Sequence, residues 1–217
     1  DPVWNFPLAY GYANVGRVEA WGQDVTGFTE GDLVYSYMPH QTGYVAPAAS
    51  LIRLPALKNP AQGVLLSNIT TAFNGVLDSP IGQDDTVVIF GQGLIGLLVT
   101  QLVRRSAATQ VITVDRIAGR RAMSEKLGAD LVLDPGDVDV AMEVRKRTGN
   151  RGADVVIEVS GSYAALQEAI RTAAPNTTIT AMSWYGGSGE ALRLSDEFHH
   201  NRVSIRSSQV GAVDPAH

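Results

Sequence analysis

The sequence contains no cysteine among its 217 residues, which excludes disulfide bridges and thiolate metal ligands within the chain. The lack of disulfides fits a cytoplasmic protein better than a small secreted module, so we expect a cytoplasmic location. No apolar run approaches the roughly 20 residues that a membrane-spanning helix needs, and no signal peptide is visible at the start. We therefore expect no membrane association.

Basic residues are too few and too scattered for a nucleic-acid-binding surface. The 17 Lys and Arg residues are outnumbered by 22 Asp and Glu residues, which gives a formal net charge of −5. The basic run Arg145-Lys146-Arg147 lies in an amphipathic segment and is predicted to be the solvated face of a helix. We expect no nucleic-acid partner.

The residues that are present form two differently patterned regions, which meet near residue 57. Residues 12–54 contain short alternating runs separated by glycine and proline turns, a pattern typical of β-structure. From about residue 60 onward, helical and strand-like segments alternate. The pattern predicts two domains, residues 1–57 and 58–217. Because the sequence opens with Asp1 inside a strand-and-loop pattern, we expect it to be a fragment of a longer chain.

The alternation in the second domain predicts its fold. Residues 86–90 form a continuous apolar run typical of a buried strand, and residues 94–106 follow with helical spacing. Repeated units of this kind predict the α/β class, with a doubly wound parallel Rossmann sheet that binds ligands at the carboxyl ends of its strands. The expected strands are residues 86–90, 110–115, 131–133, 153–159, 177–182 and 203–207, and the expected helices are residues 61–77, 94–106, 118–127, 138–148 and 163–171.

A glycine-rich motif follows the first of these strands. The sequence GQGLIG matches G-x-G-x-x-G directly after a strand and at the start of a helix. In such motifs the position of Gly91 forms the tight turn, that of Gly93 admits a pyrophosphate, and that of Gly96 lets the helix pack closely on the sheet. The helix start at Leu94 and Ile95 offers N–H groups to phosphates. We expect a dinucleotide site, the alternative being a glycine turn that binds no dinucleotide.

Asp115 ends the second expected strand, 19 residues after Gly96, close to the spacing of about 20 that this motif requires. A carboxylate at this position accepts hydrogen bonds from the adenosine ribose hydroxyls and repels a 2′-phosphate, which favours NAD over NADP. The neighbouring Arg116 could instead partner a phosphate. We therefore expect a nicotinamide dinucleotide cofactor, NAD in preference to NADP, with NADP as the alternative.

Several motifs together resemble the medium-chain dehydrogenase/reductase superfamily of alcohol dehydrogenases and quinone oxidoreductases. The sequence GYANVGRV occupies the place of that family's G-H-E-x-x-G-x-V motif, and the resemblance covers nearly the whole chain. It implies a Rossmann domain inserted in a β-rich, GroES-like catalytic domain, of which residues 1–57 are the retained part. The matching segments are residues 11–18, 22–34, 71–73, 128–130 and 152–158.

The resemblance also implies which residues contact the cofactor. Thr71 would touch the nicotinamide, and Arg120 would lie on the adenosine phosphate side, although a solvated helix residue is an equal alternative for Arg120. A homodimer or homotetramer formed near residues 191–194 is implied as well. The remaining implied contacts are Val159 and Ser160, beside the adenine and ribose, and Ser183 and Trp184, near the nicotinamide.

The chain departs from this family where zinc-dependent members bind their metal. Those members use a Cys, the His of G-H-E, and a Cys or acidic residue ahead of the Thr helix. Here Tyr12 and Ala13 stand at the His and Glu positions, and Ser67 lies four residues before Thr71. Because a phenol and a hydroxyl are poor zinc ligands, we expect no zinc and no other metal site.

Without zinc, hydrogen-bond donors must polarise a substrate carbonyl. We expect Tyr12, Ser67 or Thr71 to supply such a donor, the alternative for Tyr12 being that it only packs in the cleft. The expected function is hydride transfer between NAD and a small alcohol, carbonyl or activated alkene. A non-catalytic dinucleotide-binding protein with a structural or sensory role is the alternative function.

Overall fold

A computed structural model describes residues 7–211, and the chain divides into two compact units after Ser67. This division falls further along the chain than the boundary expected at residue 57. The 3-10 helix η2 (Pro60–Leu65) follows that boundary and contacts the strands of the first unit. Its Gly63 is buried against Leu54 and Val15, and these contacts keep the segment with the first unit.

The first unit contains a small antiparallel sheet in the order β1-β2-β3. Tyr35 in the central strand is fully buried, and a 3-10 helix, η1 (Ala48–Ser50), precedes the last strand. The β-structure expected for this part of the sequence is confirmed. The strands are β1 (Asn14–Arg17), β2 (Leu33–Ser36) and β3 (Ile52–Arg53).

The second unit contains the parallel sheet that the sequence predicts. Its order is β6-β5-β4-β7-β8-β9, and each neighbouring pair is parallel. The chain moves outward from β4 through β5 to β6, then returns to the other side of β4, so the strand order reverses between β4 and β7. The strands are β4 (Thr86–Phe90), β5 (Gln110–Val114), β6 (Leu131–Leu133), β7 (Val155–Glu158), β8 (Thr178–Ala181) and β9 (Ser204–Ser207).

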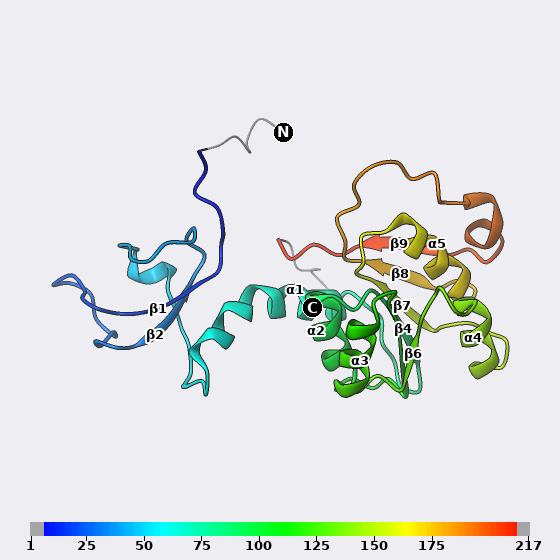
Figure 1. Cartoon of the computed structure of the whole chain (residues 1–217), viewed down its shortest axis with the longest axis horizontal. Helices are drawn as coiled ribbons and strands as arrows, with labels where there is room; N and C mark the ends of the chain where they lie inside the picture. Colours follow the sequence, from blue (N-terminus) through cyan, green and yellow to red (C-terminus); the bar gives the residue numbers. More distant parts are fainter. Residues whose placement is uncertain (1–6, 212–217) are drawn as a thin grey trace. The chain divides into compact units, whose positions relative to one another are not determined.

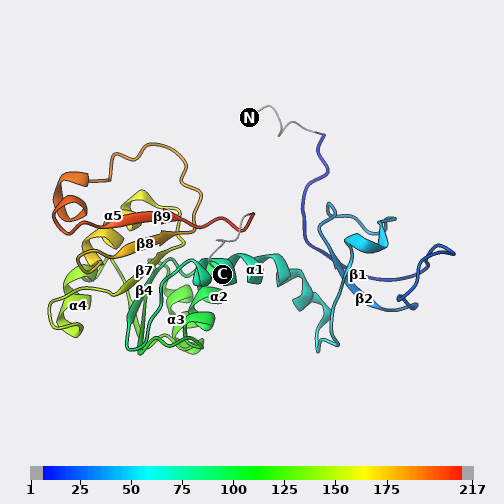
Figure 2. The same cartoon turned by 180° about the vertical axis from the view of Figure 1, so that it is seen from behind.

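Helices cover both faces of this sheet (Figure 1), and Figure 2 shows the same layers from behind. Alternate residues of β4 point to opposite faces. Val87 and Ile89 belong to the core beneath α1 and α2, whereas Val88 and Phe90 belong to the core beneath α4 and α5. The helices are α1 (Leu66–Leu77), α2 (Leu94–Val103), α3 (Ala118–Lys126), α4 (Val140–Arg147) and α5 (Tyr163–Thr172).

Most expected elements are confirmed, with ends shifted by a few residues. The clearest difference concerns residues 61–77, which were expected as one helix but form η2 followed by α1. Asn59 caps η2 by accepting a hydrogen bond from the N–H of Ala61, and Pro60 follows as the first helical residue. Within residues 7–211, no helix has the length and apolar character needed to cross a membrane.

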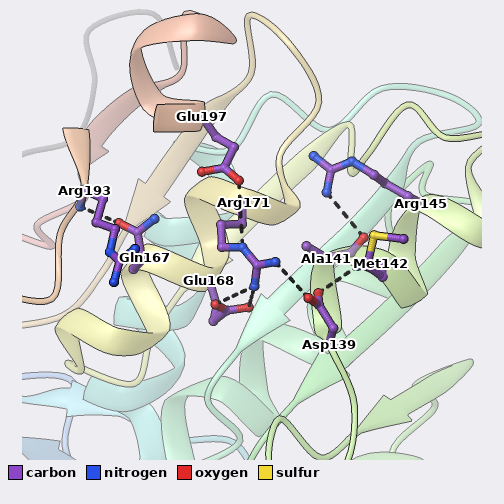
Figure 3. A network of polar contacts seen from close by, with 9 residues as sticks. All are labelled: Asp139, Ala141, Met142, Arg145, Gln167, Glu168, Arg171, Arg193 and Glu197. Carbon is purple, nitrogen blue, oxygen red and sulfur yellow. Dashed lines mark hydrogen bonds and ion pairs between the residues drawn. The ribbon is translucent and has the colours of Figure 1, made fainter. Parts of the chain in front are cut away.

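An arginine joins three elements on the α4–α5 face (Figure 3). Arg171 contacts Asp139, which caps α4, at 2.8 Å, and Glu168 one turn earlier in α5 at 2.9 Å. Its Nε also lies 3.8 Å from Glu197, in the short helical segment η3 (Leu194–Phe198). This network connects η3, which precedes β9, to the body of the sheet.

Candidate functional site

The glycine loop connects β4 to α2 at the carboxyl edge of the sheet. Gly91 has a φ of +94°, in the left-handed region where a side chain would be strained. A Cβ on Gly96 would lie 2.0 Å from the carbonyl oxygen of Gly91, so the helix can approach the turn only with glycine there. Both roles that the motif predicts for these two glycines are therefore met in the backbone.

Space remains in front of Gly93. A Cβ added there would meet nothing closer than the Arg120 guanidinium, at 4.0 Å. Gly93 is the N-cap of α2 and provides no side chain to cap it, which leaves the helix N-terminus to bind an anion. Leu94 is half exposed beside this opening, and Ile95 packs against the α1–α2 core. The backbone is therefore open at the position where the motif predicts a pyrophosphate.

Gln92 braces the glycine loop from inside. Its side chain is fully buried, its Nε2 donates to the carbonyl of Gly91 at 2.9 Å, and its Oε1 accepts from the hydroxyl of Thr100 at 2.9 Å. The same hydroxyl lies 2.9 Å from the carbonyl oxygen of Gly96, so its single proton is shared between the two acceptors. These bonds join the turn to the second turn of α2. The motif allows any residue at this position, so the sequence alone predicts no role for Gln92.

Asp115 links the glycine loop to the end of β5. Its Oδ2 accepts a hydrogen bond from the N–H of Gln92, and its Oδ1 accepts one from the N–H of Ile117, both at 2.7 Å. The residue is 8% exposed. Arg120 lies 3.8 Å from Oδ2 and is itself half exposed. The structure thus brings the predicted Asp115 and Arg120 together beside the predicted loop.

A cavity of about 720 Å³ opens at this edge of the sheet. Gly91, Asp115, Arg116, Arg120 and Ser160 line it, all of them predicted cofactor residues. Its far wall comes from the loop after β6 and from α5, where Asp134 and Glu168 are each paired with an arginine. The volume falls in the range of small-molecule sites, and the Asp115 carboxylate, predicted to accept from a ribose, lines the cavity.

The loops after β7 and β8 meet beside the glycine loop. A Cβ on Gly91 would lie 2.9 Å from the Cα of Ser160, and the N–H of Gly161 donates to the hydroxyl of Ser183 at 2.9 Å. Val159 packs against the α1–α2 core. Trp184, which follows Ser183 in the loop after β8, is 94% exposed. The predicted residues on these two loops thus border the same edge of the sheet.

Glu158 and Tyr185 also lie at this edge, and the sequence alone predicts no functional role for either. Glu158 is fully buried, and its carboxylate accepts hydrogen bonds from Ser160 and from the phenol of Tyr185. Burial, together with Glu158, raises the pKa of Tyr185 above its ordinary value, so the phenol stays protonated and donates. The one available signal was a glutamate inside an apolar strand.

The three predicted catalytic donors belong to different units. Tyr12 is 58% exposed in the first unit, and its carbonyl accepts a hydrogen bond of 3.0 Å from Tyr35. Burial raises the pKa of Tyr35, and a hydrogen bond with the buried Ser67 opposes that rise. Thr71 is half buried in the second unit, one turn after Ser67 in α1. Their joint role at a nicotinamide stays a prediction.

The residues at the expected metal position do not fit zinc. Tyr12 and Ser67 offer oxygen donors that zinc binds weakly, and the chain has no cysteine. In the part of the chain that the structure describes, no group of three His, Asp or Glu side chains could hold an ion. His199 and His200 pack edge to face, with ring centroids 5.7 Å apart.

Comparisons with known proteins agree with this architecture. Residues 95–216, more than half of the chain, match the family model described as zinc-binding dehydrogenase. D-guloside 3-dehydrogenase from Escherichia coli is 36% identical over 194 residues, which cover 88% of this chain and 55% of that protein. (R,R)-butanediol dehydrogenase from Bacillus subtilis is 32% identical over 165 residues, covering 75% and 45% respectively. The chain spans about half the length of the curated relatives that it matches.

Solved structures show the same fold. A protein from Sinorhizobium meliloti described as a zinc-binding dehydrogenase, bound to NADP, aligns with a TM-score of 0.81 at 24% identity over 94% of this chain and 69% of that one. The 2R,3R-butanediol dehydrogenase of Bacillus subtilis aligns with a TM-score of 0.76 at 24% identity, over 92% and 64%.

Proposed function

The chain belongs to the zinc-binding dehydrogenase family, among the medium-chain dehydrogenases and reductases, and we propose that it transfers hydride between NAD and a small alcohol, carbonyl or activated-alkene substrate. The observation that carries this proposal is the joint geometry of Gly93 and Asp115. The backbone leaves room for a phosphate at Gly93, and the Asp115 carboxylate holds the same loop while facing the cavity.

The residues at the site fit a dinucleotide. Gly91, Gly93 and Gly96 would hold the pyrophosphate at the start of α2, and Asp115 would accept from the adenosine ribose. The nicotinamide, when bound, supplies the hydride chemistry, and the chain supplies orientation and charge. Val159, Ser160 and Ser183 would border the remainder of the cofactor.

We propose NAD as the preferred cofactor. Asp115 presents a carboxylate where NADP would carry an additional phosphate, and Asp134 adds a second acidic group to the cavity wall. Arg116 and Arg120 are the groups that would favour NADP instead, and Arg120 already lies near Asp115. The preference for NAD over NADP therefore depends on whether the two acidic side chains outweigh the two arginines near the adenosine ribose.

We further propose that the reaction proceeds without zinc. The oxygen donors of Tyr12 and Ser67 at the expected metal position do not fit that ion. Tyr12, Ser67 and Thr71 would donate hydrogen bonds to the substrate oxygen and so stabilise the charge that develops there. The proposed setting is a cytoplasmic homodimer or homotetramer formed near residues 191–194, and light scattering on the intact protein tests the assembly.

A substrate screen of the intact protein tests the activity. Reduced nicotinamide is followed by its absorbance while NAD⁺ is offered with secondary alcohols, polyols and glycosides, and NADH with carbonyls and quinones. Glycosides are included because a relative bears the name D-guloside 3-dehydrogenase. Turnover with any of these supports the proposal. Tight cofactor binding with no turnover across the screen would favour the non-catalytic alternative.

A further inference from the structure

Asp134 presents a hydrogen-bond acceptor to the cavity at Asp115. It directly follows β6 and lines the cavity together with Pro135 and Gly136. Its Oδ1 accepts a hydrogen bond from the N–H of Gly136 at 2.9 Å, and its Oδ2 lies 2.7 Å from the Arg121 guanidinium. Because donors of the protein face both oxygens, the remaining capacity of Asp134 is to accept further hydrogen bonds.

Arg121 fixes this carboxylate beside the end of β5. The Nη1 that contacts Asp134 also donates to the carbonyl of Asp115 at 3.0 Å. The side chains of Arg121 and Asp134 are each 21% exposed, so the pair is largely shielded from solvent. The N–H of Asp115 donates in turn to the carbonyl of Leu133, the last residue of β6, at 3.2 Å. Asp134 therefore stands next to the residue proposed to accept from the ribose.

The order of the strands indicates which part of a cofactor lies nearest Asp134. The sheet runs from β4 through β5 to β6 at this edge. The glycine loop, proposed to hold the pyrophosphate, follows β4, and Asp115, proposed to accept from the adenosine ribose, follows β5. A nucleotide that continues in the same direction places its base at the end of β6, where Asp134 and Pro135 line the cavity.

The lining of the cavity suits a purine base. Apolar side chains provide contacts for the faces of an aromatic ring. Serine hydroxyls also line the cavity, but a hydroxyl can donate or accept and so does not distinguish an amino group from an oxygen. The acceptor-only side chains among the lining residues are Asp115, Asp134 and Glu168. The apolar lining residues are Phe90, Val114, Ile117, Pro135, Ala164 and Ala165.

Of the three carboxylates, Asp134 has the best position for a contact with the base. Asp115 holds two backbone N–H groups and is proposed to bind the ribose. Both oxygens of Glu168 lie 2.9 Å from one nitrogen of Arg171, within the network that joins α5 to α4 (Figure 3). Asp134 instead follows the strand beyond β5, where the base would lie.

We propose that Asp134 recognises the 6-amino group of the adenine base and so makes the site specific for adenine. The amino group is a donor and Asp134 supplies the acceptor, whereas a base with an oxygen at this position would bring two acceptors together. This inference rests on the proposed function, because it requires a dinucleotide with its adenosine in this cavity. It concerns the base, and it is separate from the preference between NAD and NADP.

Reduced nicotinamide hypoxanthine dinucleotide tests the inference. In this analogue of NADH an oxygen replaces the 6-amino group and the neighbouring ring nitrogen carries a hydrogen, while the nicotinamide that accepts energy from tryptophan is unchanged. We expect the intact protein to bind NADH at least about tenfold more tightly than the analogue. Equal affinities would overturn the inference, whereas wild-type protein that binds neither compound would refute the proposed function.

Asp134→Asn should reduce this discrimination. The asparagine amide can accept from the amino group with its oxygen or donate to the hypoxanthine oxygen with its nitrogen, so the two affinities should come within about threefold of each other. Glu168→Gln is the matched control, because it also neutralises a carboxylate of the cavity wall that is paired with an arginine. It should keep the full difference. Discrimination that persists in folded Asp134→Asn, or is lost equally in Glu168→Gln, would overturn the inference.

A comparison of two nucleotides decides the matter if Asp134→Asn does not fold. 5′-AMP and purine riboside 5′-monophosphate differ only at position 6 of the base, where the latter carries a hydrogen in place of the amino group. We expect 5′-AMP to displace NADH from the intact protein at a concentration at least about fivefold lower. Equal displacement by the two nucleotides would overturn the inference.

Discussion

The backbone N–H of Gln92 donates a 2.7 Å hydrogen bond to the carboxylate of Asp115. This bond joins the turn that would hold a pyrophosphate to the residue that would accept from the adenosine ribose. One carboxylate therefore both shapes the loop and faces the cavity. Substitutions at Asp115 should therefore change loop geometry and cofactor preference together. Substitutions of the glycines should act separately, on cofactor binding at Gly93 and on protein stability at Gly96.

Gly93→Ala should weaken cofactor binding without affecting the fold. Its Cβ meets no atom closer than 4.0 Å, and the backbone angles of Gly93, φ −73° and ψ −167°, suit alanine. The free energy of unfolding should change by less than about 0.5 kcal/mol, while NADH affinity falls at least roughly tenfold because the methyl group fills the phosphate's space. Denaturant unfolding and NADH titration measure the two effects. Retained affinity would place the phosphate elsewhere.

Gly96→Ala should destabilise the protein itself. The added Cβ would lie 2.0 Å from the Gly91 carbonyl oxygen, which is backbone and cannot rotate away. We expect a loss of about 1–3 kcal/mol in the free energy of unfolding, from the strain of separating helix and turn. Denaturant unfolding measures this loss, with Gly119→Ala as a control, because Gly119 has open space around its ideal Cβ. Equal stability of both variants would contradict the packing described for the loop.

Asp115→Asn should reduce the preference for NAD. The substitution removes the charge that repels a 2′-phosphate and weakens the acceptor for the ribose, so NADH affinity should fall about tenfold while NADPH affinity is maintained or rises. Asp137→Asn, in the exposed loop before α4, serves as the control. Parallel losses for NADH and NADPH would mean that Asp115 acts only by holding Gln92.

Tyr12→Phe tests the zinc-independent chemistry. If the phenol stabilises the substrate oxygen, its loss should reduce kcat at least roughly tenfold. Tyr10→Phe is the matched control, since Tyr10 is another exposed tyrosine of the same unit. Unchanged kcat in Tyr12→Phe would assign Tyr12 to packing and leave Ser67 and Thr71 as the donors.

Arg171→Met should destabilise the protein in a pH-dependent way. Hydrogen bonds from Arg171 and from the N–H of Met142 hold the pKa of Asp139 below its ordinary value. A carboxylate whose folded pKa is depressed stabilises the fold above its unfolded pKa of about 4 and loses that contribution as the pH falls through the folded value.

Because these ion pairs are partly exposed to solvent, we expect Arg171→Met to lose about 0.5–1 kcal/mol of unfolding free energy at neutral pH. The deficit should shrink below about pH 4. Arg105→Met, which removes an exposed arginine just after α2 whose side chain donates to the carbonyl of Gln101, controls for loss of charge. A deficit independent of pH would show that the ion pairs contribute little.

The sequence was informative where local pattern and tertiary role coincide. Continuous apolar runs such as residues 86–90 predicted buried parallel strands, because few other structures bury every side chain. The boundary near residue 57 was less predictable, because the contacts of Gly63 with Val15 and Leu54 join residues distant in sequence. Gln92 and Glu158 were missed for a related reason: their partners are defined only once the loops are folded.

Titration of the intact protein with NADH and NADPH, followed by energy transfer from tryptophan to the reduced nicotinamide, tests the central claim most directly. Gly93→Ala, with its expected unchanged stability, is the matched control. Saturable NADH binding that is tighter than NADPH binding and is lost in this variant is the predicted result. No binding of either cofactor to the folded protein would contradict the claim that the glycine loop is a dinucleotide site.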